Sequence, residues 1–389
     1  MHIAFLAHAD NIHAGRWADF LVSRGHKLTL LCDPPVHSPP RGVRLIHPEM
    51  RLVTKVLAFR LFPKPYGNNF YKRFPYRREL NRLKPDLVHG FEALGYGYAL
   101  AHAGPFPKVL TPFGNDILHD PKKSRIARFL VTTALKKADI ITTNYLELAE
   151  TLTRIYGTPQ SKIRPFSWGV DCNIFKPGYR EETRRLRSEL DIPTDARVIL
   201  SNRVMKPYWG IETIARALPA VFREIPGAFA VFLRGTGDPS YEEKIRNILG
   251  KEKALERVRF VDRFLSPLEM AHYLNLAECF VSCPRTDLLS ISLLEGMACG
   301  CVPVTSKLES YKKRITHGEN GLFFRGGDPD ELAEQLVKIL RHPEWISSFR
   351  EKNVRLIGEK DDWNKNALIL ESIYKDLVKK SGYPGSGER

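Results

Sequence analysis

Short apolar runs alternate with longer segments of helical spacing along most of this chain. Residues 2–7 are mostly apolar, as is typical of a strand buried in a parallel sheet, and residues 8–15 form a predicted polar loop. Residues 16–24 carry apolar side chains at helical spacing, and a second apolar run follows at residues 27–32. The pattern therefore predicts a strand, a helix and a strand, which together make one βαβ unit.

The alternation continues through the first half of the chain and then stops. The next predicted strands and helices are, in order, 86–89, 96–102, 108–112, 124–137, 139–143, 145–156 and a strand from residue 163. Residues 166–178 are rich in turn residues and lack periodicity. We therefore place a domain boundary after residue 170.

A charged helix is predicted at residues 180–190, and the alternation then resumes. The predicted strands are 198–201, 229–233, 258–261, 279–282 and 302–305, and the helices between and after them are 211–221, 241–249, 267–276, 292–298 and 329–340. Strands that alternate with helices predict an α/β fold with open parallel sheets. We expect two such domains, 1–170 and 171–359, then an amphipathic helix at 360–378 and a disordered tail at 379–389.

The net charge of +16 is distributed unevenly over the 389 residues. Residues 1–170 hold 25 Lys and Arg against 12 Asp and Glu, so most of the excess lies in the first half. Such a field attracts nucleic acid, acidic small molecules or anionic lipid. The six cysteines are too few for a disulfide scaffold, so we expect reduced thiols and a cytoplasmic chain. No run of 18 apolar residues occurs, so no membrane span is predicted.

Residues 51–84 combine ten Lys and Arg with one acid and many aromatic residues. A helix there would show Arg73, Arg77, Arg78 and Arg82 as one stripe, although Pro75 could start the helix and leave Arg73 outside. Cations and rings at this density are typical of a surface that binds anionic membranes. Two alternatives stay open, namely helices whose rings pack inward and a site for single-stranded nucleic acid.

Residues 279–305 place two acids around a predicted helix start. Asp287 lies in the loop after a strand, and the helix begins near Ile291 or Ser292 and contains Glu295. The free amides of a first helical turn attract anions, so a phosphate would bond to the amides of Ile291 and Ser292 while Glu295 accepts from ribose hydroxyls. The alternative is that Ser290 or Ser292 only caps the helix.

The sequence from Asp287 through Glu295 and Gly-Met-Ala-Cys-Gly resembles the paired-acid motif of glycosyltransferase family 4. Further segments that resemble this family are His13–His26, Lys84–His89, Leu110–Asp116, Gly169–Asp171 and Asn320–Pro329. The resemblance implies a GT-B fold, in which two Rossmann-like domains face each other across a cleft and a C-terminal helix crosses back to the first domain. It also implies transfer of a sugar from a nucleotide-sugar with retention at the anomeric carbon.

The resemblance assigns roles to individual residues. It implies that Glu295 binds the nucleotide ribose and that Asp287, where the family usually has Glu, faces the donor sugar. It also implies that Arg203 and a nearby lysine, here Lys206, bind the donor diphosphate. Many members have a His near the reacting carbon where this chain has Phe113, so either no His is needed here or the first-domain half of the site is rebuilt around Asp116.

Three further residues are weaker donor-binding candidates. Gly15 could let the first loop approach the donor phosphates, or it could simply begin a helix. Gly235 belongs to a Gly-rich loop after a strand, which is either a phosphate contact or a tight turn. Arg263 follows another strand and would lie beside the base, with an ordinary charged surface residue as the alternative.

Positive charge is what the predicted reaction requires. Negative charge grows on the nucleotide diphosphate as it leaves, and Arg203, Lys206 and the helix amides would stabilise it without a metal or other cofactor. Asp328 and Asp330 indicate a helix start and not a metal clamp.

We therefore predict a retaining glycosyltransferase that is peripheral to the inner face of the cell membrane, with a nucleotide-sugar donor and a lipid-linked or glycan acceptor. The alternatives are a nucleotide-sugar epimerase of GT-B fold and a non-catalytic binding protein that kept the fold. A nucleic-acid binder is a third, but no RNA-binding or helix-turn-helix motif supports it.

Overall fold

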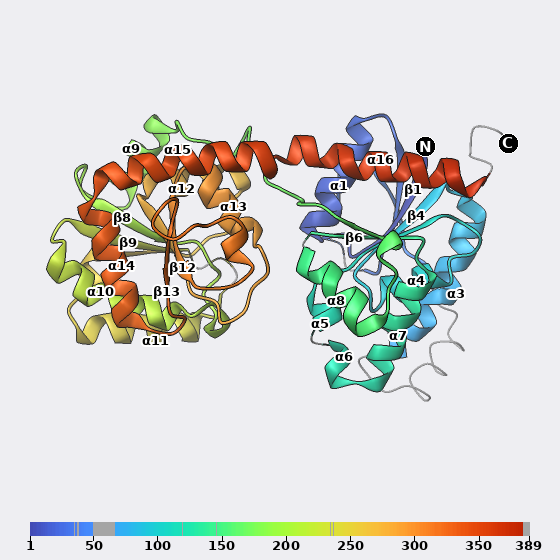
Figure 1. Cartoon of the computed structure of the whole chain (residues 1–389), viewed down its shortest axis with the longest axis horizontal. Helices are drawn as coiled ribbons and strands as arrows, with labels where there is room; N and C mark the ends of the chain where they lie inside the picture. The colour runs from blue at the N-terminus through green and yellow to red at the C-terminus, as the bar shows by residue number, and fades with distance from the viewer. Residues whose placement is uncertain are drawn as a thin grey trace. The chain divides into compact units, whose positions relative to one another are not determined.

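The computed structural model describes residues 1–34, 36, 39–49, 67–118, 120–144, 146–233, 235 and 237–383. Residues 51–66, the first part of the basic and aromatic stretch, lie outside this range. The chain divides into two compact units. Unit 1 comprises Met1–Ser167 and Lys365–Arg389, and unit 2 comprises Trp168–Asn364. Each has its own parallel sheet with helices on both faces (Figure 1), so the predicted α/β class is confirmed.

Unit 1 is built on strands that pair in parallel in the order β3-β2-β1-β4-β5-β6-β7. Its strands are β1 (His2–Leu6), β2 (Lys27–Leu31), β3 (Arg44–Ile46), β4 (Leu87–Phe91), β5 (Lys108–Thr111), β6 (Ile140–Thr143) and β7 (Ile163–Pro165). Its helices are α1 (Ile12–Ser23), α3 (Gly67–Leu83), α4 (Tyr96–Ala101), α5 (Asn115–Leu118), α6 (Asp120–Lys123), α7 (Arg125–Lys137), α8 (Leu146–Tyr156) and the 3-10 turn η1 (Gln160–Lys162).

Unit 2 repeats the design with the strand order β10-β9-β8-β11-β12-β13. Its strands are β8 (Arg197–Ser201), β9 (Ala228–Leu233), β10 (Val258–Val261), β11 (Cys279–Ser282), β12 (Val302–Ser306) and β13 (Leu322–Phe324). Its helices are α9 (Arg180–Glu189), α10 (Ile211–Glu224), α11 (Pro239–Lys251), α12 (Pro267–Leu276), α13 (Ile291–Ala298), α14 (Pro329–Arg341) and α15 (Pro343–Lys360), with 3-10 turns η2 (Pro207–Trp209), η3 (Leu255–Arg257) and η4 (Tyr311–Lys313).

The last helix, α16 (Trp363–Ser381), returns the chain to unit 1. Glu371 on this helix is 4% exposed and bonds to Arg24 and His26, which lie between α1 and β2, at 3.2 and 3.1 Å. Tyr374, one turn further on, is fully buried and bonds to His89 of β4. The helix ends three residues later than the 378 predicted from the sequence, so residues 379–381 are helical. Residues 384–389 of the predicted tail lie outside the described range.

Two helix starts differ from the sequence prediction. Helix α1 begins at Ile12 because the Asn11 side chain accepts from the Ala14 amide and caps it, so the predicted loop over 8–15 is four residues too long. Helix α3 begins at Gly67 and runs through Pro75. Proline lacks an amide, but a helix of this length tolerates the loss of one bond when packing holds it. Tyr71 and Tyr76, on either side of the proline, supply that packing because both are buried.

No helix among the described residues is both long enough and apolar enough to cross a bilayer. All six cysteines are free thiols, as the sequence predicts.

Candidate functional site

Arg203 lies at the centre of a buried polar cluster at the carboxyl edge of the unit 2 sheet. It follows β8 and is 9% exposed. Its Nε donates to the Ser282 hydroxyl at the end of β11 at 3.1 Å. Its Nη2 donates to the Asp287 carboxylate, and to the hydroxyls of Ser290 and Tyr311 at 3.0 Å each. The two neighbouring strands thus bring together the Arg and the acid that the sequence analysis treated separately.

The charge of Arg203 is stabilised by its surroundings. Burial disfavours the charged form, but the attraction of Tyr311 and Asp287 outweighs it, so the pKa of the guanidinium is raised above its ordinary value. The plane of the guanidinium also lies over the Trp209 ring, 4.2 Å from its centroid. Arg203 is therefore a permanent cation in a fixed orientation.

Asp287 is held by three donors. Its Oδ2 accepts from Arg203 and from the Tyr311 hydroxyl, the latter at 2.8 Å. Its backbone carbonyl accepts from the Ser310 hydroxyl at 2.8 Å. The sequence analysis missed Tyr311, because nothing in the sequence places η4 beside the loop after β11. Ser282 carried a signal, since it ends the strand next to β8.

Helix α13 begins where the sequence predicted. Ser290 is its N-cap, and the side chain accepts from the Leu293 amide at 3.2 Å, so the capping alternative holds for Ser290. The Asn202 side chain donates to the Ser292 carbonyl at 3.1 Å and ties the helix start to the loop after β8. Within the described residues, no acceptor bonds to the amides of Ile291 and Ser292. This first turn is consistent with the predicted anion site.

Glu295 lies one turn into α13 and is half-buried. The next residue, Gly296, packs against Phe280 of β11 so closely that a Cβ atom there would overlap the phenyl ring. A larger residue would push α13 away from the sheet. The glycine therefore fixes the depth at which Glu295 sits at this edge.

The loop after Arg203 carries Lys206 and ends at a required glycine. Lys206 is exposed and is the cap of the η2 turn. Gly210 has a φ of +65°, and a Cβ atom there would overlap the backbone carbonyl of Cys283. Only glycine lets this loop approach the end of β11 so closely, and that approach places Trp209 over Arg203.

Two weaker candidates have different surroundings. Gly235 has a φ of +55°, which favours glycine, and its Cβ position lies 3.6 Å from Val204, next to Arg203 in the chain. Arg263 is exposed and pairs with Glu269, the N3 residue of the capping box of α12. The structure thus places Gly235 beside the cluster and gives Arg263 a surface ion pair.

Several buried polar atoms at this edge have no hydrogen-bond partner among the described residues. They are the Ser201 and Ser306 hydroxyls, the Thr305 hydroxyl and the Asn202 amide oxygen. All four residues lie at the carboxyl ends of β8 and β12 or directly after them. Buried polar groups normally have hydrogen-bond partners, so this edge is suited to binding water or a polar ligand.

The carboxyl edge of unit 1 is organised differently. Asp116 is 3% exposed, and its two oxygens accept from the backbone amides of Ala93, Phe113 and Gly114. Burial, together with the nearby charge of Glu92, raises the pKa of Asp116 to about 7. Asp116 thus ties the loop after β4 to the loop after β5, a role different from the predicted catalytic one.

Other first-domain candidates also have different surroundings from those expected. Gly15 lies inside α1, and its amide donates to the Asn11 carbonyl at 2.9 Å, so the prediction that it belongs to the first loop is wrong. The His13 ring lies 5.9 Å from that of Phe113, the residue at the family's histidine position. Burial lowers the pKa of His13 to about 4, so its ring is neutral near pH 7.

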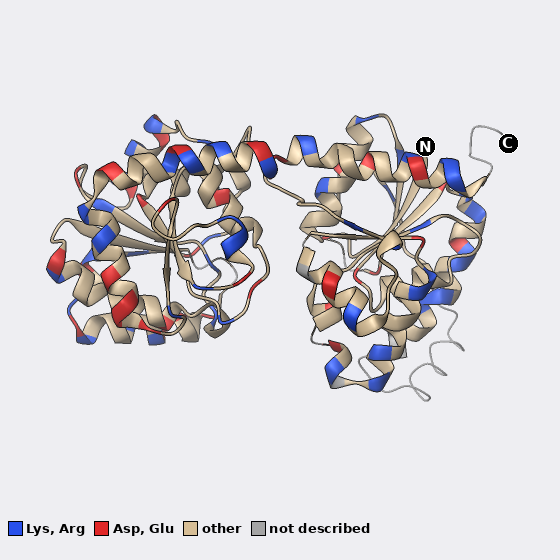
Figure 2. Ribbon diagram, viewed as in Figure 1, with Lys and Arg blue, Asp and Glu red and all other residues tan. Residues whose placement is uncertain are grey.

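The arginine stripe of α3 divides into two parts. Figure 2 marks the Lys and Arg positions along the described ribbon in blue. The Arg73 guanidinium packs between the rings of Phe70 and Phe74 and donates to the Tyr98 hydroxyl at 3.2 Å. Arg73 therefore contacts its own helix and α4, and it does not join the exposed stripe that the sequence predicted. Arg77, Arg78 and Arg82 are exposed, and the last two bond to Glu79.

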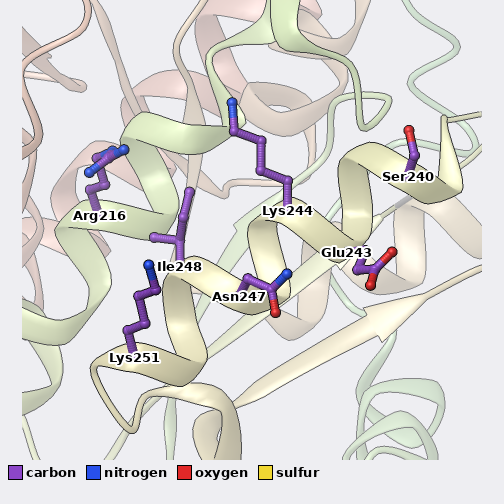
Figure 3. A pocket seen from close by; sticks show the side chains of 7 residues that line it. All are labelled: Arg216, Ser240, Glu243, Lys244, Asn247, Ile248 and Lys251. Carbon is purple, nitrogen blue, oxygen red and sulfur yellow. The ribbon is translucent and has the colours of Figure 1, made fainter.

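A separate hollow of about 380 Å³ lies on unit 2 between α10 and α11 (Figure 3). It is lined by Arg216, Ser240, Glu243, Lys244, Asn247, Ile248 and Lys251. Lys244 already pairs with Glu212 at 2.7 Å. The charges around this hollow are mixed, and none of its lining residues belongs to the predicted site.

Comparison with solved structures identifies the fold as GT-B. The sucrose-phosphate synthase of Thermosynechococcus elongatus superposes with a TM-score of 0.78 at 18% identity, covering 98% of this chain and all of that one. HepE of Anabaena, solved in complex with UDP and glucose, superposes with a TM-score of 0.74 at 18% identity, covering 96% and 100% of the two chains. At these identities the likeness concerns the fold, and both neighbours have the GT-B fold that the sequence predicts.

Family models and curated relatives agree on the class. Residues 196–342 match the model described as glycosyl transferases group 1, and residues 2–145 match the glycosyl transferase 4-like model. The D-inositol 3-phosphate glycosyltransferase of Corynebacterium glutamicum (strain R) is 23% identical over 269 residues, which are 68% of this chain and 64% of that protein. The match thus spans less than two thirds of that relative. The chain belongs to the family 4 type of glycosyltransferases.

Proposed function

We propose that this protein is a retaining, metal-independent hexosyltransferase that uses a nucleotide-diphosphate sugar. Its acceptor is lipid-linked or a glycan, and it works at the cytoplasmic face of a membrane. The observation that carries the proposal is the charged edge of unit 2, where the Arg203 guanidinium and the amides of Ile291 and Ser292 provide two kinds of anion-binding donor. The HepE structures in complex with UDP and glucose and with UDP-glucose support a sugar-nucleotide donor.

The charge on this edge fits the leaving group. When the bond between sugar and nucleotide breaks, negative charge builds on the diphosphate, and fixed donors that meet it lower the barrier. Arg203 provides a permanent charge, Lys206 a flexible exposed one, and the first turn of α13 its amides and dipole. These groups supply the stabilisation that a bound metal supplies elsewhere, so the proposal includes no metal and no further cofactor.

The exposed part of α3 supports the membrane component. Arg77, Arg78 and Arg82 face solvent, and Phe74 nearby is 51% exposed. Each cation near an anionic surface contributes about 1 kcal/mol, and an exposed ring inserts at the interface. Arg73 is not part of this surface because it packs on Phe70 and Tyr98.

A thermal-shift screen of UDP-, GDP- and ADP-glucose tests the donor component. We expect one of them to raise the melting temperature, by an amount that grows with its concentration. The sugar-nucleotide that binds is then incubated with the protein in the absence of acceptor. Turnover to an isomeric sugar-nucleotide would instead identify an epimerase, and no shift with any of the three would refute the donor site.

Flotation with vesicles tests the membrane component. The variant with Arg77, Arg78 and Arg82 all changed to Gln should lose flotation with vesicles containing anionic lipid at moderate salt. The matched control changes Arg180, Arg184 and Arg185, which are exposed on α9 of unit 2, to Gln and so removes the same net charge. The control should still float. Equal loss in both variants would mean that net charge, and not α3, drives binding.

A further inference from the structure

Arg203 uses its Nε and Nη2 donors inside the protein. Nε is bound to Ser282, and Nη2 is bound to Asp287, Ser290 and Tyr311. Nη1 has no hydrogen-bond partner among the described residues. It is also not one of the fully buried polar atoms that lack a partner. The guanidinium is therefore fixed along one edge and offers the other edge, at Nη1, to a ligand.

Tyr311 connects the partners of this arginine. Its side chain is fully buried, and its hydroxyl accepts from Arg203 while donating to Asp287 at 2.8 Å. Burial raises the pKa of this hydroxyl to about 12, so it keeps the proton that it donates. Ser310, the residue before it, holds the Asp287 carbonyl at 2.8 Å. The short segment at η4 therefore forms hydrogen bonds to both the side chain and the backbone of Asp287.

The pair of Arg203 and Asp287 is expected to persist when a phosphate binds. Their side chains are 10% and 15% exposed, and separating a buried ion pair strands both charges. The free Nη1 lets Arg203 meet a phosphate without giving up Asp287. As long as Asp287 remains paired with Arg203, its Oδ2 accepts hydrogen bonds from Arg203 and Tyr311.

We infer that Tyr311 and Asp287 are positioning residues, which orient Arg203 so that Nη1 points to the donor phosphates. Asp287 serves the arginine and not the donor sugar. This inference rests on the proposed function, because it takes the ligand of Arg203 to be a nucleoside diphosphate. It gives Tyr311 a role, and it gives Asp287 a different role from the sugar contact implied by the family resemblance.

The first experiment measures what the second phosphate contributes to binding. UMP and UDP, or the GMP or AMP pair if the screen selects that base, are titrated by calorimetry into the full-length wild type, Tyr311→Phe and Asp287→Asn. We expect both variants to weaken diphosphate binding by about 10- to 100-fold while binding of the monophosphate changes much less. General misfolding would weaken both ligands equally, and circular dichroism melts would reveal it.

Tyr208→Phe is the matched control for Tyr311→Phe. Tyr208 is 51% exposed, and its hydroxyl bonds to Thr286, directly before Asp287, at 2.8 and 3.0 Å. This variant removes a hydroxyl that bonds to the residue before Asp287 and makes no bond to Arg203. The ratio of the two dissociation constants should stay near that of the wild type. If Tyr208→Phe weakened diphosphate binding as much as Tyr311→Phe does, the order of the loops in general would explain the loss of affinity, and the orientation of Arg203 would not.

The second experiment separates the arginine from the sugar as the partner of Asp287. Asp287→Asn is titrated with the nucleoside diphosphate and with the matching nucleotide-sugar. We expect both to lose affinity by the same factor. A loss confined to the nucleotide-sugar would overturn the inference, because it would place Asp287 on the sugar. Tighter diphosphate binding would overturn it as well, because Asp287 would then compete with the phosphate. If no nucleotide binds the wild type, it is the proposed function that fails.

Discussion

The two sheets end in edges of the same kind, but the edges treat their polar groups differently. In unit 1, Asp116 gives both oxygens to backbone amides of the adjoining loops. Glu92, in the loop after β4, likewise accepts from the amides of Leu94, Gly95 and Tyr96. In unit 2, Arg203 is held by side chains and keeps Nη1 without a partner in the described part of the chain.

The polar groups at the unit 1 edge stabilise their own loops, whereas Arg203 at the unit 2 edge is available to bind a ligand. An acid whose oxygens accept several amides shapes its loops and has little capacity left for a substrate. An arginine held in place with one nitrogen outward is preorganised to meet an anion, with little reorganisation when the anion arrives. The same parallel-strand edge therefore supports two tasks, and substitutions at four residues test this difference.

The largest expected effect is that of Arg203→Ala. With the donor found by the screen, kcat should fall by about 100- to 1,000-fold with a smaller change in donor KM, because the leaving group gains charge toward the transition state. Steady-state kinetics check this, with Arg341→Ala as the control, since Arg341 forms an exposed pair with Glu224. Normal kcat with only a raised KM would show that Arg203 binds without aiding the chemistry.

Asp116→Ala should act on the fold of unit 1 instead. It leaves the amides of Ala93, Phe113 and Gly114 without their acceptor, at a cost of roughly 1–3 kcal/mol for each one that stays buried. Chemical denaturation should show a lower free energy of unfolding, while nucleotide affinity of the folded fraction is unchanged. If Asp116→Ala bound nucleotide more weakly but kept the wild-type free energy of unfolding, a purely structural role for Asp116 would be contradicted.

The pH dependence of the same residue has a definite sign. The pKa of Asp116 is raised to about 7 when folded, so between its ordinary value and 7 the folded chain holds the proton more strongly than the unfolded chain. The stability of wild type relative to Asp116→Asn should therefore fall as pH rises from about 4 to about 7. A difference that stays constant over this range would show that burial does not shift this carboxyl.

Gly210→Ala should disturb the unit 2 edge through its backbone. The residue has a φ of +65°, which costs a non-glycine residue about 1–3 kcal/mol, and the new Cβ would overlap the Cys283 carbonyl. We expect a lower melting temperature and weaker nucleotide binding, because the loop that carries Trp209 must move. Gly227→Ala, at a glycine with open space around its Cβ position and no positive φ, is the matched control and should change neither.

Glu295→Ala tests the predicted ribose contact. Loss of a charge-assisted bond to a ribose hydroxyl should weaken nucleotide binding by about 1.5–3 kcal/mol. Calorimetry with the ribonucleoside diphosphate and its 2′-deoxy analogue checks the assignment, since the two ligands should bind the variant more equally than they bind wild type. An unchanged affinity in a folded variant would remove Glu295 from the ribose site.

The sequence predicted most of the strands and helices but missed some connections between them. Apolar runs and amphipathic segments are set by local periodicity. The strand Cys279–Ser282 appears as predicted, and the helix predicted at 211–221 begins at Ile211 and runs on to Glu224. The start of α1 was predicted too late because the Asn11 cap was overlooked, and α15 was missed because its apolar residues are sparse. The edge strands β3 and β13 are too short to give a pattern.

The sequence by itself determined the α/β class, the two successive βα patterns and the motif from Asp287 to Glu295, because these depend on residues close together in the chain. Only the tertiary structure decided that Arg203 pairs with Asp287, that Tyr311 joins them and that Asp116 is spent on backbone amides. Arg203, Asp287 and Tyr311 lie in loops that follow β8, β11 and β12, which are neighbours in the sheet but are separated by whole helices in the chain. Such contacts are set by strand order and loop geometry, which local periodicity does not encode.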